Sequence, residues 1–233
     1  MKHLIVGMGE IGNALKEILR ERWADVFTKD IQKKEVPKVD TLHVALRYSE
    51  SFKQIVQGYI QQARPNLVVI HSTVPVGTTK SFGDIAVHSP NRGLHPNLAQ
   101  SIRRFIKHVG GSRAVEAAHI FNECGIWTKV YATSEITEAQ HILSNTLYGI
   151  NIMAAKEMND FCRAHNLDYH EVVMEYTQTH NLGYRQMGME SKVRPIIYPP
   201  QGKIGGHCIV QNAQLIPQKE RTPLIDMLAR FND

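Results

Sequence analysis

Three glycines near the start of the chain, Gly7, Gly9 and Gly12, have the G-x-G-x-x-G spacing of a dinucleotide-binding turn. They follow a short apolar run at residues 3–6 and precede an amphipathic stretch at residues 11–22, which is the strand–turn–helix context that this spacing requires. Gly7 permits a tight turn, Gly9 lets a pyrophosphate approach the backbone, and Gly12 lets helix and strand pack closely. The pattern therefore predicts an α/β fold built for a dinucleotide.

An acidic residue after the second expected strand extends the predicted cofactor site. Asp30 lies eighteen residues after Gly12, where a carboxylate accepts hydrogen bonds from a ribose diol. Its charge repels a 2′-phosphate and favours NAD over NADP, although the lysines at positions 29, 33 and 34 leave that choice open. We predict that NAD binds at Gly7, Gly9, Glu10, Ile11, Gly12, Asp30, Ser72 and Thr73.

Short β-branched runs alternate with longer amphipathic stretches through the first 131 residues. This alternation predicts a Rossmann-type, doubly wound parallel sheet with right-handed crossovers. We expect strands at 3–6, 26–28, 42–46, 67–71, 85–88, 106–109 and 128–131, with helices at 11–22, 49–62 and 112–124. Ser112 is the expected N-cap of the last helix, and Gly125 is expected to end it.

The pattern changes at Ser134. Residues 135–165 contain no proline and a single glycine, and apolar residues recur every three or four positions, at Ile136, Ala139, Leu143, Leu147, Ile150 and Ala154. This spacing predicts one long helix, followed by a second helix at 169–180 and a loop rich in glycine and proline at 183–206. We therefore predict an NAD-binding Rossmann domain at 1–133 and a mostly helical domain at 134–233.

The composition excludes several classes of protein. The chain has 233 residues and a formal charge of +5, from 27 Lys and Arg against 22 Asp and Glu. The positive residues form no tract, so a pocket for an anionic ligand is favoured over a nucleic-acid surface. No apolar run is long enough to cross a membrane, and we expect a soluble, cytoplasmic protein.

Two further motifs bear on chemistry. The segment 71–79, His-Ser-Thr-Val-Pro-Val-Gly-Thr-Thr, follows an apolar strand where α/β sheets place their ligands, although an ordinary loop explains it equally well. At 205–208, two glycines precede His207 and Cys208, and they can bring the thiol of Cys208 against a ligand. Taken together, the motifs resemble the UDP-glucose/GDP-mannose dehydrogenase family, and the stretch 200–209 is most similar to the branch that oxidises UDP-N-acetylhexosamines.

The resemblance implies an NAD-dependent, four-electron oxidation of a primary alcohol to a carboxylate, with a sugar nucleotide as substrate. In such a mechanism Cys208 forms a thiohemiacetal and then a thioester. Asn145 stabilises the developing oxyanion, His141 acts as a donor or base, and Thr73 lines the pocket. Family members dimerise through the long helix, so the resemblance also implies a homodimer; the apolar residues Ile142, Ile152, Met153 and Met158 lie beyond the single stripe and favour it.

The sequence departs from the family at charged positions. His141 replaces a lysine, Asn91 replaces a glutamate, and Asn212 replaces an acidic residue, so a slow enzyme is expected. The 25 residues after Cys208 are too few for the family's C-terminal sugar-nucleotide domain, and we interpret the chain as a truncated relative.

Other interpretations stay open. A two-electron hydroxyacid dehydrogenase shares the Rossmann and long-helix plan and does not need Cys208, and the lost charges favour a degenerate NAD-binding protein. His141 as a solvated helix residue and Cys208 as a buried one are the simpler alternatives. Cys124 and Cys162 are expected to be packing residues, and His88, His95 and His207 form no metal pattern, so we predict no metal.

Overall fold

The computed structural model describes residues 1–30, 36–94, 96–204 and 209–232. The chain forms two compact units, Met1–His141 and Ile142–Asp233. The first contains the sheet, and the described part of the second is helical. The first residues of the long helix thus belong to the sheet-containing unit.

A seven-stranded sheet with strand order β2-β1-β3-β4-β5-β6-β7 forms the centre of the first unit. The strands are β1 (His3–Val6), β2 (Val26–Lys29), β3 (Thr41–Val44), β4 (Leu67–Ile70), β5 (Ala86–His88), β6 (Lys107–Gly110) and β7 (Thr128–Tyr131). Its helices are α1 (Glu10–Arg20), α2 (Phe52–Ala63), α3 (Leu98–Arg104) and α4 (Ala114–Glu123), with a 3-10 turn at Thr79–Phe82. The predicted α/β class and all seven predicted strands are confirmed.

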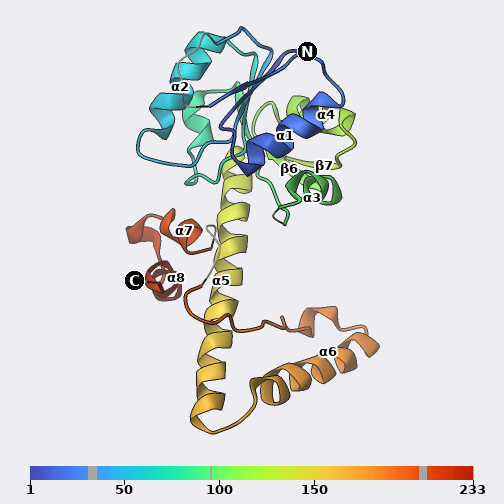
Figure 1. Ribbon diagram of the computed structural model, residues 1–233, viewed down its shortest axis with the longest axis vertical. Coiled ribbons are helices and arrows are strands. Elements are labelled where there is room, and N and C mark those ends of the chain that lie inside the picture. The colour runs from blue at the N-terminus through green and yellow to red at the C-terminus, as the bar shows by residue number, and fades with distance from the viewer. Residues whose placement is uncertain (31–35, 95, 205–208, 233) are drawn as a thin grey trace. The chain divides into compact units, whose positions relative to one another are not determined.

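Helices cover both faces of the sheet. Apolar residues of α1, α3 and α4 form one buried layer, and residues of α2 form the other. Figure 1 shows α2 on one side of the strands and α1 and α4 on the opposite side. Burial on both faces explains the nearly continuous apolar strands such as Leu67–Ile70, all of whose residues are buried.

The strand order reverses between β1 and β3. The chain passes from β1 to β2 on one side and then returns to pair β3 with the other side of β1. Such a switch point leaves a crevice outside the carboxyl ends of the two strands, where α/β proteins bind their ligands. The glycine turn after β1 lies at this crevice.

The sheet departs from a fully parallel arrangement at one step. β5 and β6 are antiparallel and pair only at His88 and Gly110, whereas the other neighbouring strands are parallel. An antiparallel step needs no crossover along the sheet. In the described part of the connection the chain forms the short helix α3, which the sequence pattern did not predict.

One predicted cap is wrong and one predicted stop is confirmed. Arg113 occupies the N-cap of α4 without a side-chain cap, and the Ser112 hydroxyl donates to the carbonyl of Asp84 at 3.0 Å instead. Gly125 has φ +73°, a left-handed conformation that glycine adopts without strain. The contact with Asp84 therefore outweighs the local capping preference of Ser112.

The described part of the second unit is helical. It contains α5 (Ser134–Ala164, begun in the first unit), α6 (Tyr176–Gln186), α7 (Ile209–Gln214) and α8 (Pro223–Arg230), with a π-helical segment at His170–Glu175 and 3-10 turns at Glu190–Lys192 and Gln218–Glu220. The second predicted helix is longer than expected, so Gly183 lies inside α6 rather than in a loop. Within the described residues, no helix is long and apolar enough to cross a membrane.

The predicted apolar stripe of α5 does not face a core along its length. Ile136, Leu143 and Leu147 are 40%, 52% and 61% exposed, whereas Thr137 and Glu138 are buried. Apolar periodicity cannot identify this face, because the residues that α5 buries near its start are polar. Farther along, Gly149 permits close packing: a Cβ there would lie 2.5 Å from the Ile209 side chain and 2.7 Å from the Leu228 side chain, and these would have to shift.

Three buried histidines cross the sheet from strand to strand. His3 Nδ1 lies 3.1 Å from His43 Nε2, and His43 Nδ1 lies 3.1 Å from His71 Nε2. His71 Nδ1 lies 3.0 Å from the carbonyl oxygen of Ser89. Because that carbonyl can only accept, His71 must carry its proton on Nδ1, and the same tautomer follows for His43 and His3. This row of hydrogen-bonded histidines, the histidine chain, ends at His3 Nε2, a buried acceptor with no partner among the described residues.

Burial keeps these histidines neutral. It lowers the pKa of His3 to about 4, and it holds the pKa values of His43 and His71 well below the ordinary 6.5. Each neutral ring has one donor and one acceptor nitrogen, which is what a continuous chain of hydrogen bonds requires. Protonating His43 or His71 on Nε2 would place two donors against each other, whereas protonating His3 on Nε2 would leave a charged group buried.

We predict that the first unit loses stability as the pH falls below 6.5. The folded pKa values are lowered, so the unfolded chain binds more protons between about pH 4 and 6.5 and the free energy of unfolding falls through that window. His3 alone, with a pKa of about 4, accounts for roughly 3 kcal/mol. Urea unfolding from pH 4.5 to 7.5 measures this slope. His43→Gln should flatten it, exposed His119→Gln should not, and identical slopes in both variants would contradict the prediction.

Candidate functional site

The glycine turn after β1 has the close contacts expected of a dinucleotide-binding turn. Gly7 has φ +92°, and a Cβ there would lie 2.5 Å from the carbonyl oxygen of Ala45. A Cβ on Gly12 would lie 1.9 Å from the carbonyl oxygen of Gly7. Gly9 has no atom within 4 Å of the corresponding position. Two glycines thus permit close packing, and the third leaves open space above the backbone.

The N-terminus of α1 faces this open space. Gly9 is its N-cap and makes no side-chain cap hydrogen bond, while Glu10 and Ile11 form the start of the helix. The first N–H groups of a helix have no partners within it and attract anions. Asn13 stabilises the turn: its Nδ2 donates to the carbonyl of Met8 at 2.8 Å and to the carbonyl of Gly9 at 3.1 Å. The described residues therefore fit a pyrophosphate.

Asp30 lies directly after β2, which pairs with β1 beside the glycine turn. The residue is exposed. Burial raises the pKa of Tyr59 on α2, and the charge of Asp30 raises it further, so the carboxylate and the phenol are near each other. An exposed carboxylate at this position is available to a ribose hydroxyl. Lys33 and Lys34 lie outside the described residues.

The loop after β4 is held by a residue that the sequence interpretation did not single out. Glu138 of α5 is 1% exposed; one carboxylate oxygen accepts the N–H of Gly77 at 2.6 Å, and the other accepts the N–H of Thr79 at 2.8 Å. Burial raises the pKa of Glu138, and the hydrogen bonds with Thr79 and Gly77 oppose that shift. The sequence contains one indication of this role: Glu138 is an acidic residue among the regularly spaced apolar residues of α5.

The predicted loop residues Ser72 and Thr73 lie at the same sheet edge as the glycine turn. Ser72 is buried, and its hydroxyl donates to the carbonyl of Val44 at 3.4 Å, whereas Thr73 is half-buried. His88 contacts both this loop and α5: its Nε2 lies 3.2 Å from the carbonyl oxygen of Ser72, and its Nδ1 lies 2.9 Å from the Thr137 hydroxyl. Burial lowers the pKa of His88 to about 3.

The predicted catalytic residues do not all lie in one unit of the structure. His141 is half-buried in the first unit, and burial, with the charges of Lys107 and Arg92, lowers its pKa to about 4. Its imidazole is therefore neutral at pH 7, as predicted, and a weak base. Asn145 belongs to the second unit, and Cys208 lies outside the described residues. Their joint action with Thr73 stays a prediction.

The other cysteines and Asn212 have definite surroundings. Cys124 and Cys162 are buried, and burial raises the pKa of Cys124 to about 11, so its thiol is protonated at neutral pH. Asn212 is 4% exposed within the second unit. Among the described residues, no cluster of His, Cys, Asp and Glu could hold a metal ion.

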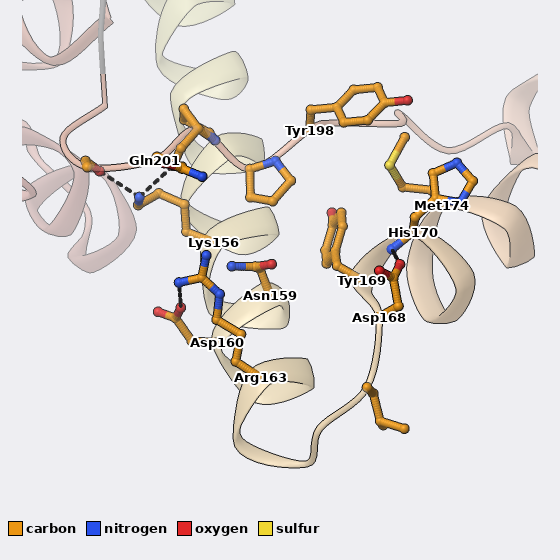
Figure 2. Close-up of a pocket in the computed structure, with 14 residues that line it drawn as sticks. Lys156, Asn159, Asp160, Arg163, Asp168, Tyr169, His170, Met174, Tyr198 and Gln201 are labelled. Atoms are coloured by element: carbon orange, nitrogen blue, oxygen red, sulfur yellow. Dashed lines mark hydrogen bonds and ion pairs between the residues drawn. The ribbon is translucent and has the colours of Figure 1, made fainter.

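The second unit has a large hollow of its own, about 700 Å³, that no predicted site residue lines. Figure 2 shows Lys156, Arg163 and Asp160 projecting from α5 on one side and Tyr169 and His170 on the other. Lys156 Nζ donates to the carbonyls of Pro200 and Gly202 at 2.9 and 2.6 Å. Its lining mixes both charges, so no single class of ligand is favoured.

Comparison with known proteins agrees with the resemblance expected from the motifs. No protein-family model matches the chain. The UDP-N-acetyl-D-mannosamine dehydrogenase of Methanocaldococcus jannaschii is 24% identical over 242 residues, covering 99% of this chain and 53% of the relative. The chain thus spans about half the length of the curated relatives it matches.

Solved structures show the same fold. A UDP-D-ManNAc dehydrogenase from Pyrococcus horikoshii aligns with a TM-score of 0.83 and 17% identity, covering 100% of this chain and 68% of that chain. The 3-hydroxyisobutyrate dehydrogenase of Mycobacterium tuberculosis aligns with a TM-score of 0.70 and 15% identity, covering 99% and 93%. At these identities the likeness establishes a Rossmann-like dehydrogenase fold.

The contacts of the glycine turn predict opposite responses to alanine at two positions. Gly12→Ala should lower the free energy of unfolding by roughly 1–3 kcal/mol, because the added methyl overlaps the carbonyl of Gly7 and outweighs the better helix propensity of alanine. Gly9→Ala meets no atom within 4 Å and should change stability little. Urea unfolding of both variants at pH 7.5 tests this, and equal stability of the two would refute the packing argument.

Proposed function

We propose that the chain binds NAD at the glycine turn and takes part in the NAD-dependent oxidation of an alcohol. The observation that supports this most is the open space above Gly9 at the switch point between β1 and β3. The uncapped start of α1 and the exposed carboxylate of Asp30 add to it. The dehydrogenase names of the relatives point the same way.

In this proposal the N–H groups at Gly9, Glu10 and Ile11 bind the pyrophosphate, and Asp30 binds the adenosine ribose. Ser72 and Thr73 border the nicotinamide end, in a loop that Glu138 holds in place. NAD held by these residues would supply the hydride acceptor for the oxidation. The chain's own residues orient the cofactor through these N–H groups, the Asp30 carboxylate and the loop that contains Ser72 and Thr73.

The covalent step is proposed for Cys208. The first hydride transfer converts the alcohol to an aldehyde, and the thiolate of Cys208 adds to it to form a thiohemiacetal. Removal of a second hydride, for which a further NAD would be the acceptor, would leave a thioester on Cys208, and water would hydrolyse it to the carboxylate and the free thiol. Asn145 donates to the oxyanion, and neutral His141 donates or accepts a hydrogen bond but stabilises negative charge less than a cation. We expect slow turnover for that reason.

The substrate and the assembly are also proposals. The names of the relatives favour a sugar nucleotide, and a smaller anionic alcohol is the alternative. Exposed apolar side chains on α5, Leu143, Leu147, Tyr148, Met158 and Phe161, favour a homodimer through this helix. Three of the residues on which the sequence bases the predicted dimer, Ile142, Ile152 and Met153, are buried within the chain and do not support it. We expect a soluble, cytoplasmic protein with no nucleic-acid partner.

A two-electron hydroxyacid dehydrogenase is the second candidate. The 3-hydroxyisobutyrate dehydrogenase is matched over 93% of its length, so a protein of that plan needs no additional domain. The product distinguishes the candidates: one NADH per substrate supports the two-electron reaction, and two support the four-electron reaction.

The cofactor proposal predicts that Gly9→Val abolishes NAD binding while the fold persists, because the branched side chain fills the space intended for the pyrophosphate. Asp30→Ala should weaken NAD binding roughly tenfold, equivalent to one charge-assisted hydrogen bond. Calorimetric titration measures both affinities, with exposed Asp84→Ala as the matched control. Unchanged affinity in both Gly9→Val and Asp30→Ala would sink the proposal.

The cysteine proposal predicts that Cys208→Ala stops at the aldehyde and keeps its affinity for NAD. Buried Cys162→Ala is the control for loss of a thiol elsewhere. The measurement is mass spectrometry of products and quenched protein after incubation with UDP-N-acetylmannosamine and other nucleotide sugars or hydroxy acids. Full carboxylate formation by Cys208→Ala would rule out the mechanism, and no turnover of any compound by the unmodified chain would favour a degenerate NAD-binding protein.

A further inference from the structure

Lys107 on β6 is buried in an unusual environment. Its residue is 4% exposed, and its Nζ lies 4.9 Å from the centre of the Phe121 ring. Nζ donates to the carbonyls of Ser89 and Pro90, each at 3.2 Å, and to Asn91 Oδ1 at 2.7 Å. All of these acceptors are neutral, and no described carboxylate forms an ion pair with Lys107. Lysine is almost never buried unless it is paired with an opposite charge.

The groups around Lys107 are neutral or positive. The Ser89 carbonyl also accepts from neutral His71, and the charge of Lys107 lowers the pKa values of His43, His71, His88 and His141. Burial, and then the charge of Arg92, lowers the pKa of Lys107 itself to about 7. An anion bound here would be attracted by Lys107 and Arg92 and repelled by none of these neighbours.

Asn91 is oriented by Lys107. The ammonium can only donate, so the amide oxygen faces Nζ, and Nδ2 points to the other side. Nδ2 is buried and has no acceptor among the described residues, and a buried donor without an acceptor is unfavourable because it has lost its hydrogen bond to water. A hollow of about 10 Å³ is lined by Pro90, Asn91, Arg92, Lys107 and neighbouring apolar residues, which is room for about one oxygen atom.

We propose that Asn91 and Lys107 form a binding site for one oxygen of a carboxylate, in which Asn91 Nδ2 donates to the oxygen and Lys107 supplies the charge. The hollow has room for about one oxygen atom, so a single carboxylate oxygen enters it. The site does not depend on NAD binding or on alcohol oxidation, so it stands or falls separately from the proposed function.

The test uses formate, the smallest carboxylate, as the probe and follows the side-chain amide of Asn91 by NMR. The Asn91 cross-peak, assigned by its loss in Asn91→Asp, should shift and saturate with formate at pH 6.5 and should not respond to chloride at the same ionic strength. Lys107→Met should weaken formate binding at least tenfold, whereas exposed Lys53→Met should leave it unchanged.

Two further readouts do not depend on the folding of Lys107→Met. In the unmodified chain, formate affinity should fall roughly tenfold between pH 6 and pH 8, as Lys107, with a pKa of about 7, loses its proton. Asn91→Asp places a carboxylate beside Lys107 and should raise the melting temperature at pH 7. An Asn91 amide that exchanges with bound water but ignores formate, or formate binding that is unaffected by pH, would overturn the proposal.

Discussion

The contact between Gly12 and the carbonyl of Gly7 is the constraint on which the candidate site depends. No side chain fits between them, since a Cβ would lie 1.9 Å from that oxygen. The contact sets α1 directly on the end of β1, so the N-terminus of the helix lies at the crevice between β1 and β3. A dinucleotide could use the open space at Gly9, the carboxylate of Asp30 and the loop held by Glu138 only if its pyrophosphate binds at the N-terminus of α1. The contact between Gly12 and Gly7 is what puts that N-terminus at the crevice.

Buried polar groups distinguish this sheet from a simple apolar core. The histidine chain and Lys107 lie on the face covered by α1, α3 and α4, and Phe121 of α4 contacts Lys107 and two of the histidines. Burial keeps the histidines neutral, which allows the hydrogen bonds between them but removes the positive charge that an oxyanion needs. Lys107 and Arg92 are therefore the sources of positive charge close to His141, and they explain how an anion could still be attracted to this side of the unit.

The similar proteins differ in how much of their length this chain matches. Those named as UDP-N-acetyl-D-mannosamine dehydrogenases extend well beyond the matched region, whereas the hydroxyisobutyrate dehydrogenase is matched almost throughout. The sheet-containing unit is compatible with both, because a Rossmann unit supplies cofactor binding and leaves substrate choice to other segments. The covalent step proposed for Cys208 is what would separate a four-electron from a two-electron oxidation.

The sequence alone determined the glycine turn, the positions of the strands and the length of α5, because these depend on local spacing. His3–Val6 and Thr128–Tyr131, for example, match their predicted bounds. Tertiary structure decided the antiparallel step at β5 and β6 and the polar buried face of α5, because burial depends on what packs against an element. It also decided the histidine chain and the Lys107–Asn91 pair, whose partners lie 40, 28 and 16 residues apart. Only the register of the sheet brings them within hydrogen-bond distance, and no local pattern encodes that register.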